Sequence, residues 1–151
     1  MPSPAAKPAV LEIYDTTLRD GAQAEDVSFS AEDKVRVAQQ LDGLGVQFIE
    51  GGWPGANPKD IEFFRMIKTI PLQTATVVAF GSTRKASNTV QADPNIKALL
   101  DAETKVITLF GKSWSLHVTD ALGISLAKNL EIISDSVAHL RSKDRRLFYD
   151  A

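Results

Sequence analysis

The sequence Val10-Leu11-Glu12-Ile13-Tyr14-Asp15-Thr16-Thr17-Leu18-Arg19-Asp20-Gly21 joins a short apolar run to a charged turn. The apolar part predicts a strand, and Gly21 allows the chain to turn soon after it. Arg19 and Asp20 therefore lie just past a strand end. An aspartate in this position can hold a hard divalent cation, and an arginine beside it can hold an anionic oxygen. The pair suits enolate chemistry on keto acids.

Similar apolar segments recur along the chain, and helix-like segments separate them. We expect strands over residues 10–15, 46–50, 74–80, 105–110 and 146–150. Most are continuous apolar runs, which is typical of parallel strands buried on both faces. Their first residues lie 28 to 41 positions apart. This spacing fits repeated βα units around a parallel sheet.

The intervals carry helix-start signals. Ser30 begins a capping sequence, and Ser125 opens a longer helix. Asn57-Pro58 and Asp93-Pro94 each combine an N-cap residue with a first-turn proline. We therefore predict a helix after each of the first four strands.

The pattern is of the α/β class and fits two architectures, a doubly wound sheet and a (β/α)₈ barrel. No Gly-x-Gly-x-x-Gly follows the first strand, so the nucleotide-binding form of the doubly wound sheet lacks its fingerprint. A complete barrel needs about 250 residues. We expect residues 10–151 to be the N-terminal half of a TIM-barrel catalytic domain, a fragment ending in the fifth strand. Residues 1–9 are expected to be a disordered tail.

Composition excludes several classes of function. The chain has no cysteine, so disulfides, thiolate nucleophiles and thiolate zinc sites are absent from it. The net charge is −2, and no basic stripe indicates a nucleic-acid or membrane partner. No apolar run reaches the ~18 residues of a membrane span, and the first residues lack a signal core. We expect a cytoplasmic protein.

The motif at residues 15–23, Asp-Thr-Thr-Leu-Arg-Asp-Gly-Ala-Gln, resembles the signature of the metal-dependent Claisen-condensing TIM barrels. These are the isopropylmalate, homocitrate and citramalate synthases, with the related hydroxymethylglutaryl-CoA lyases. The citramalate synthase branch is resembled further at 50–60 (Glu-Gly-Gly-Trp-Pro-Gly-Ala-Asn-Pro-Lys-Asp), at 110–114 with 116–119, and at 147–151 (Leu-Phe-Tyr-Asp-Ala). The resemblance implies an acyltransferase that condenses acetyl-CoA with pyruvate to citramalate and coenzyme A, in isoleucine biosynthesis. It also implies a homo-oligomer.

The resemblance gives roles to residues at strand ends. Arg19 would hold the keto-acid carbonyl oxygen and the charge that develops on it. Asp20 would bind a divalent metal (Mg, Mn or Zn), completed in the family by a His-x-His pair that this chain lacks. Glu50 would be a catalytic residue at the rim, paired with Arg19 or with the metal's waters; a purely structural ion pair is the alternative. Gly51 and Gly52 would leave room for a ligand or merely allow a turn.

Other expected substrate-binding residues follow the first and fourth strands. Gln23 would bind the substrate carboxylate or steady Arg19; a solvent-exposed loop amide is the alternative. Lys112 would contact a carboxylate or the coenzyme A phosphates. Ser113 would bind the keto acid or cap the next helix. His117, on a short helix, would bind substrate or be structural.

Three other functions stay open. The same chemistry could act on 2-oxoisovalerate or 2-oxoglutarate, because each methylene is discriminated by only ~1–3 kcal/mol. A lyase would run the reaction backwards. A non-catalytic half-barrel would expose the edges of its first and fifth strands and pair with another copy.

Overall fold

The computed structural model describes residues 11–151, so the expected tail and the first residue of the expected first strand lie outside the described residues. Strands and helices alternate as predicted. They are β1 (Tyr14–Asp15), α1 (Ala31–Gly43), β2 (Phe48–Gly52), α2 (Pro58–Ile67), β3 (Thr76–Ser82), α3 (Pro94–Asp101), β4 (Val106–Phe110), α4 (Leu126–Ser142) and β5 (Arg146–Asp150). A 3₁₀ turn (Gly21–Gln23) follows β1, and a π-helical turn (His117–Ala121) precedes α4.

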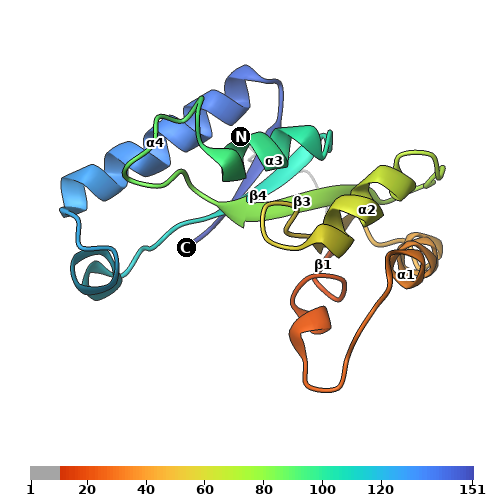
Figure 1. Cartoon of the computed structure of the whole chain (residues 1–151). Coiled ribbons are helices and arrows are strands. Elements are labelled where there is room, and N and C mark those ends of the chain that lie inside the picture. Colours follow the sequence, from red (N-terminus) through yellow and green to blue (C-terminus); the bar gives the residue numbers. More distant parts are fainter. Residues whose placement is uncertain (1–10) are drawn as a thin grey trace, which may run out of the picture.

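The five strands form one parallel sheet in chain order, β1-β2-β3-β4-β5. The sheet curls, and α1 to α4 lie along one side of it (Figure 1). A doubly wound sheet would instead reverse its strand order and carry helices on both faces. Sequential order with helices on one side is the arrangement of a half-barrel, which confirms the expected fold class.

The main hydrophobic core lies between the sheet and its helices. Alternate strand residues such as Ile49, Ala79 and Ile107 face it, and each is fully buried. Phe63 and Phe64 of α2 pack into the same core with ring centroids 5.3 Å apart. Burying a side chain of this size stabilises a fold by about 1.5–3 kcal/mol.

A second apolar cluster covers the other side of the sheet, which faces the interior of the half-barrel. Phe48, Val78 and Val106 form it, and Tyr14 and Phe148 pack against them. The rings of Tyr14 and Phe148 meet edge to face at 5.2 Å, and those of Phe48 and Phe148 at 5.1 Å. The continuous apolar character of the strands therefore serves two separate clusters.

The predicted helix starts are all present. Ser30 and Asp33 form a reciprocal capping box at α1, and the side chains of Asn57, Asp93 and Ser125 cap α2, α3 and α4. Each such cap is worth about 0.5–2 kcal/mol. None of the helices that residues 11–151 form combines the length and apolar character of a membrane span.

The boundaries of β1 and β2, the strands that lead to Arg19 and Glu50, differ from the sequence prediction. β1 has only two residues, because the amide of Ile13 donates to the Gln47 side chain at 2.7 Å rather than to a neighbouring strand. β2 continues to Gly52 through an irregularity in its pairing with β3 between Glu50 and Gly52. Both changes bear on the positions of the residues that follow these strands.

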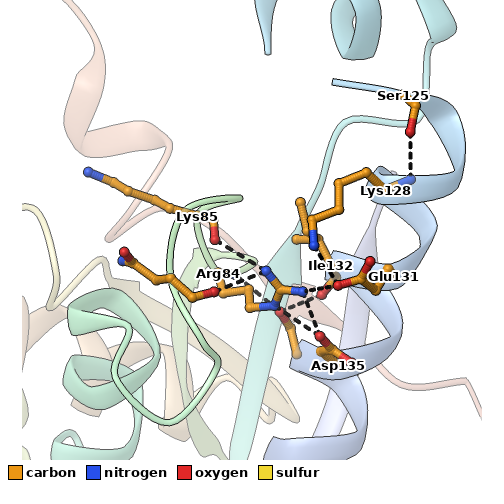
Figure 2. Close-up of polar contacts among 9 residues, drawn as sticks. Arg84, Lys85, Ser125, Lys128, Glu131, Ile132 and Asp135 are labelled. Carbon is orange, nitrogen blue, oxygen red and sulfur yellow. Dashed lines mark hydrogen bonds and ion pairs between the residues drawn. The ribbon is translucent and has the colours of Figure 1, made fainter. Parts of the chain in front are cut away.

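The end of β3 is tied to α4 by a buried arginine. Arg84 is 5% exposed, and its Nη2 lies 2.6 Å from Asp135 and 3.0 Å from Glu131 (Figure 2). Its Nη1 also donates to the carbonyl of Asn88 at 3.1 Å. All these partners lie outside the motif residues, so we assign Arg84 a structural role.

Candidate active site

The loop after β1 presents Arg19 at the carboxyl end of the strands. The amides of Arg19 and Asp20 both donate to the carbonyl of Thr16, at 3.1 and 2.9 Å. The Asp15 carboxylate accepts the amide of Thr17 at 2.9 Å. Leu18 is fully buried in the core. The turn and its apolar anchor therefore fix the direction in which Arg19 leaves the backbone.

Arg19 makes three different contacts. Its Nε donates to Glu50 Oε1 at 2.5 Å, and its Nη1 donates to Asp20 Oδ1 at 3.0 Å. Its guanidinium carbon lies 4.0 Å from the centre of the Phe80 ring. Among residues 11–151 no hydrogen bond is made by Nη2, and the side chain is 18% exposed. These free donors are available to an anionic oxygen.

Glu50 is only 1% exposed, and its carboxylate accepts hydrogen bonds from β1 and from the loop after it. Oε1 accepts from Arg19, and Oε2 accepts the hydroxyl of Tyr14 at 2.5 Å. The Tyr14 oxygen lies 2.5 Å from Thr108 Oγ1. Burial and the hydrogen bond to the Glu50 carboxylate raise the pKa of Tyr14 well above its ordinary value. Tyr14 therefore stays protonated and remains a donor.

Sequence reasoning singled out Arg19 and Glu50 but not Tyr14 or Thr108. The signal was present, because a tyrosine and a threonine each stand inside an apolar strand segment. A buried hydroxyl needs a hydrogen-bond partner, so such residues in strands that end near a charged motif are candidates for the site.

These residues surround a cleft of about 370 Å³. Its walls come from β1, β2, β4 and β5 and the loop after β1. The lining residues are Tyr14, Thr16, Arg19, Glu50, Thr108, Phe148, Tyr149 and Asp150.

Lys112, Ser113 and His117 meet at a second cleft, of about 380 Å³, which Asp150 also lines. His117 is exposed, and its ring packs 4.8 Å from that of Trp114. The Ser113 hydroxyl lies 3.5 Å from the Gly111 carbonyl, and it caps none of the helices formed by residues 11–151. The two clefts adjoin at Asp150 on the end of β5.

Gln23 and Asp20 line neither cleft. Gln23 is exposed in the 3₁₀ turn, and within the described residues its side chain makes no hydrogen bond to Arg19. The side chain of Asp20 is 63% exposed and pairs with Arg19. Residues 11–151 contain no group of three or more His, Cys, Asp or Glu able to hold a metal. They do not fit a metal ion by themselves, since Asp20 supplies a single carboxylate.

The space beside the two glycines after Glu50 is filled by other side chains of the protein. A Cβ at Gly51 would collide with the Phe63 ring, and one at Gly52 would collide with the Asp60 carboxylate. Asp60 is buried and forms an ion pair with Lys34, and its Oδ2 accepts the amide of Trp53 at 2.8 Å. The close neighbours of these glycines are therefore protein side chains, and the expectation of room for a ligand is not supported here.

A family model and several curated relatives match this chain over most of its length. The family model described as HMGL-like matches residues 10–149. The chain is 54% identical over 147 residues to (R)-citramalate synthase of Synechocystis sp., covering 97% of this chain and 27% of that protein. It is 32% identical over 139 residues to 2-isopropylmalate synthase of Solidesulfovibrio magneticus, covering 92% of this chain and 26% of that protein.

The fold has counterparts among solved structures. The HMG-CoA lyase of Bacillus subtilis superposes with a TM-score of 0.67 at 20% identity, covering 99% of this chain and 47% of that one. At this identity the likeness concerns the fold. The chain spans about a quarter of the length of the curated relatives and about half of the Bacillus subtilis HMG-CoA lyase.

Proposed function

The chain belongs to the HMGL-like family, and from that premise we propose that it forms the keto-acid end of the active site of a citramalate synthase. The reaction joins the acetyl carbon of acetyl-CoA to the keto carbon of pyruvate, and water then hydrolyses the thioester to give citramalate and free coenzyme A. The choice within the family is supported by identity, which is 50–55% to citramalate synthases of five species and 32–36% to 2-isopropylmalate synthases.

The observation that carries the proposal is the arrangement of Arg19. Its edge is held by the buried Glu50 and its face by Phe80, while donors remain free at the cleft. When the acetyl carbon, having lost a proton, attacks the keto carbon, negative charge develops on the keto oxygen. Preorganised donors aimed at that oxygen lower the barrier. Arg19 fulfils this role in our proposal, and Glu50 keeps it aimed.

The second cleft suits the other substrate. Lys112 supplies a cation, and Ser113 and His117 supply polar groups beside it. We propose that Lys112 contacts a phosphate of coenzyme A or a substrate carboxylate. A phosphate or carboxylate at this rim would gain a charge-assisted hydrogen bond.

Other groups of the proposed active site would come from outside residues 11–151. Asp20 remains our proposed ligand for a divalent cation whose other ligands would come from elsewhere, and no step above depends on it. We propose that the base that accepts the acetyl proton also comes from outside these residues. Gln23 is retained as a substrate-carboxylate residue. A homo-oligomer, a place in isoleucine biosynthesis and a cytoplasmic location are proposed from the family resemblance.

The test is coenzyme A release from acetyl-CoA by the complete protein with pyruvate, 2-oxobutyrate, 2-oxoisovalerate or 2-oxoglutarate, with and without divalent metal. We expect activity with pyruvate that requires metal. A preference for 2-oxoisovalerate or 2-oxoglutarate would overturn the substrate but keep the chemistry. Cleavage of a hydroxyacyl-CoA without condensation would indicate a lyase instead.

Arg19→Ala tests the mechanism directly. Losing one preorganised oxyanion donor typically costs about 10²–10³ in kcat. Arg36→Ala is the matched control, because this arginine is 78% exposed and pairs only with Asp33 among the described residues. Turnover near wild type in Arg19→Ala would remove Arg19 from the mechanism.

A further inference from the structure

A chain of hydrogen bonds crosses the interior of the half-barrel and ends on Glu50. Tyr14 comes from β1, Glu50 from β2 and Thr108 from β4. The Tyr14 hydroxyl lies 2.5 Å from Glu50 Oε2 and 2.5 Å from Thr108 Oγ1. Three strands far apart in the sequence thus meet in one polar network beneath Arg19.

The direction of each hydrogen bond follows from counting protons. A tyrosine hydroxyl has one proton, and an ionised carboxylate can only accept. Tyr14 must therefore donate to Glu50, and Thr108 must donate to Tyr14. With Arg19 donating to the other carboxylate oxygen, every hydrogen bond in the network is oriented toward Glu50. Such chains strengthen cooperatively in a low-dielectric interior.

The tyrosine ring is itself held in place by packing. Its centroid lies 6.2 Å from the Phe48 ring in a stacked arrangement and 5.2 Å from the Phe148 ring in an edge arrangement. The hydroxyl therefore has little freedom to follow a displaced carboxylate. A buried Glu50 without this donor would keep only its bond to Arg19, and one bond leaves the carboxylate free to rotate.

We propose that Tyr14, oriented by Thr108, is a positioning residue that fixes the Glu50 carboxylate and through it the direction of the Arg19 guanidinium. Neither residue needs to touch the substrate's reacting atoms for this role. The inference rests on the function proposed above for Arg19. It assigns a task to two residues that the motif of residues 15–23 does not include.

The decisive variants are at Thr108, because packing and hydrogen bonding there predict opposite results. Thr108→Val keeps the shape and loses the hydroxyl, whereas Thr108→Ser keeps the hydroxyl and loses a methyl group. Positioning predicts that Val lowers kcat at least severalfold and that Ser restores it to near wild type. If Thr108 serves only packing, Thr108→Val should keep a higher kcat than Thr108→Ser. Equal kcat in all three proteins, or a loss only with Ser, would overturn the proposal.

Tyr14→Phe removes the hydroxyl between Thr108 and Glu50 and retains the ring. Hydrogen bonds to charged groups contribute enough that we expect kcat to fall about 10- to 100-fold. The KM for acetyl-CoA should stay unchanged, because the effect acts on the keto-acid oxygen. Thr104→Val is the matched control, since its buried hydroxyl bonds the carbonyl of Val106 at 2.8 Å near the opposite end of β4. It should leave kcat within about twofold.

A double-mutant cycle separates failure of this proposal from failure of the proposed function. Tyr14→Phe and Glu50→Gln, alone and together, are compared by urea unfolding. The network predicts coupling of about tenfold in the unfolding equilibrium constant. Additive effects would overturn the network even if wild type shows no citramalate synthase activity. Coupling in an active wild type, with unchanged kcat in Tyr14→Phe and Thr108→Val, would overturn positioning alone.

Discussion

The Phe80 ring supports the face of the Arg19 guanidinium, and this contact can be separated from the ion pair with Glu50. The guanidinium carbon lies 4.0 Å from the ring centre, and Phe80 is 6% exposed. A partly desolvated cation–π contact is worth about 0.5–2 kcal/mol. Phe80→Leu should therefore raise the KM for the keto acid by roughly 2- to 30-fold. Steady-state kinetics with varied pyruvate measure this change.

Phe110→Leu is the control for this experiment. Phe110 stacks on Phe80 with centroids 5.2 Å apart, so the substitution removes the same ring volume next to Phe80. Among residues 11–151, the cation–π contact of the Arg19 guanidinium is with Phe80 and not with Phe110. Equal changes in KM for both variants would show that ring packing, rather than the cation–π contact, holds Arg19.

The residues of the site differ in how far the sequence predicts them. Arg19 follows the first predicted strand and Glu50 ends the second, and the carboxyl ends of parallel strands meet at one edge. Their proximity could therefore be expected before the fold was known. Tyr14 and Thr108 lie within apolar strand segments, where no alternation shows which residues face the barrel interior. Their role becomes visible only when the helices are known to cover one face.

At the scale of the element, the end of β2 depends on Gly52. Its φ is +144°, a backbone conformation that side chains rarely adopt, and a Cβ there would collide with the Asp60 carboxylate. Asp60 is in turn the buried partner of Lys34. Strained backbone positions cost about 1–3 kcal/mol each. We expect Gly52→Ala to lower the free energy of unfolding by at least that amount, measured by urea denaturation.

Gly43→Ala provides the comparison. Gly43 closes α1, and a Cβ there would meet no atom within 4 Å. Alanine at a compatible site stabilises by about 0.4–1 kcal/mol, because the unfolded chain loses freedom. Similar effects of the two substitutions would show that the end of β2 adapts to a side chain at Gly52.

Element boundaries illustrate what local propensity misses. β2 and β3 each begin and end two residues later than the apolar runs predict. The added residues include Gly51, Gly52 and Gly81, which propensity treats as strand breakers. Gly52 and Gly81 nevertheless pair with Ala79 and Leu109. Glycine is favoured at all three positions because a Cβ atom there would approach Phe63, Asp60 or Leu99 closely. Tertiary packing thus determines where these strands stop.

At the scale of the whole molecule, the interior of the half-barrel carries charge at both ends and aromatic rings between them. Arg146, at the start of β5, pairs with Glu12 at 3.0 Å and lies over the Phe48 and Phe148 rings. Arg19 and Glu50 occupy the other end. The aromatic rings lie between the two ion pairs. The candidate site is therefore separated by apolar side chains from the Arg146–Glu12 pair at the amino ends of the strands.

Loops between the layers are held by carboxylates whose charge the fold requires. Asp42, near the end of α1, accepts the amides of Gln73, Thr74 and Ala75 at 2.7 to 2.8 Å, and these bonds lower its pKa. Burial would raise the pKa of Asp93, but hydrogen bonds from Lys85, Asn88 and the first turn of α3 outweigh it, so the pKa is lowered. Both groups join a helix terminus to a loop.

This arrangement predicts acid sensitivity with a definite sign. A carboxylate with a lowered folded-state pKa stays charged where the unfolded chain, near an ordinary value of about 3.9, already binds protons. The stability it contributes is complete above that value and is lost as pH falls below it. Urea unfolding between pH 7 and pH 3 should therefore show a falling free energy at the acid end. Asp42→Asn should lower the free energy of unfolding at pH 7 and make its decrease toward pH 3 smaller.

Asp26→Asn is the control. Asp26 is exposed, and asparagine also tolerates its φ of 63°, so the free energy of unfolding should decrease with pH as in wild type. If the free energy of unfolding decreased toward pH 3 as steeply in Asp42→Asn as in wild type, other carboxylates would be responsible for the acid sensitivity.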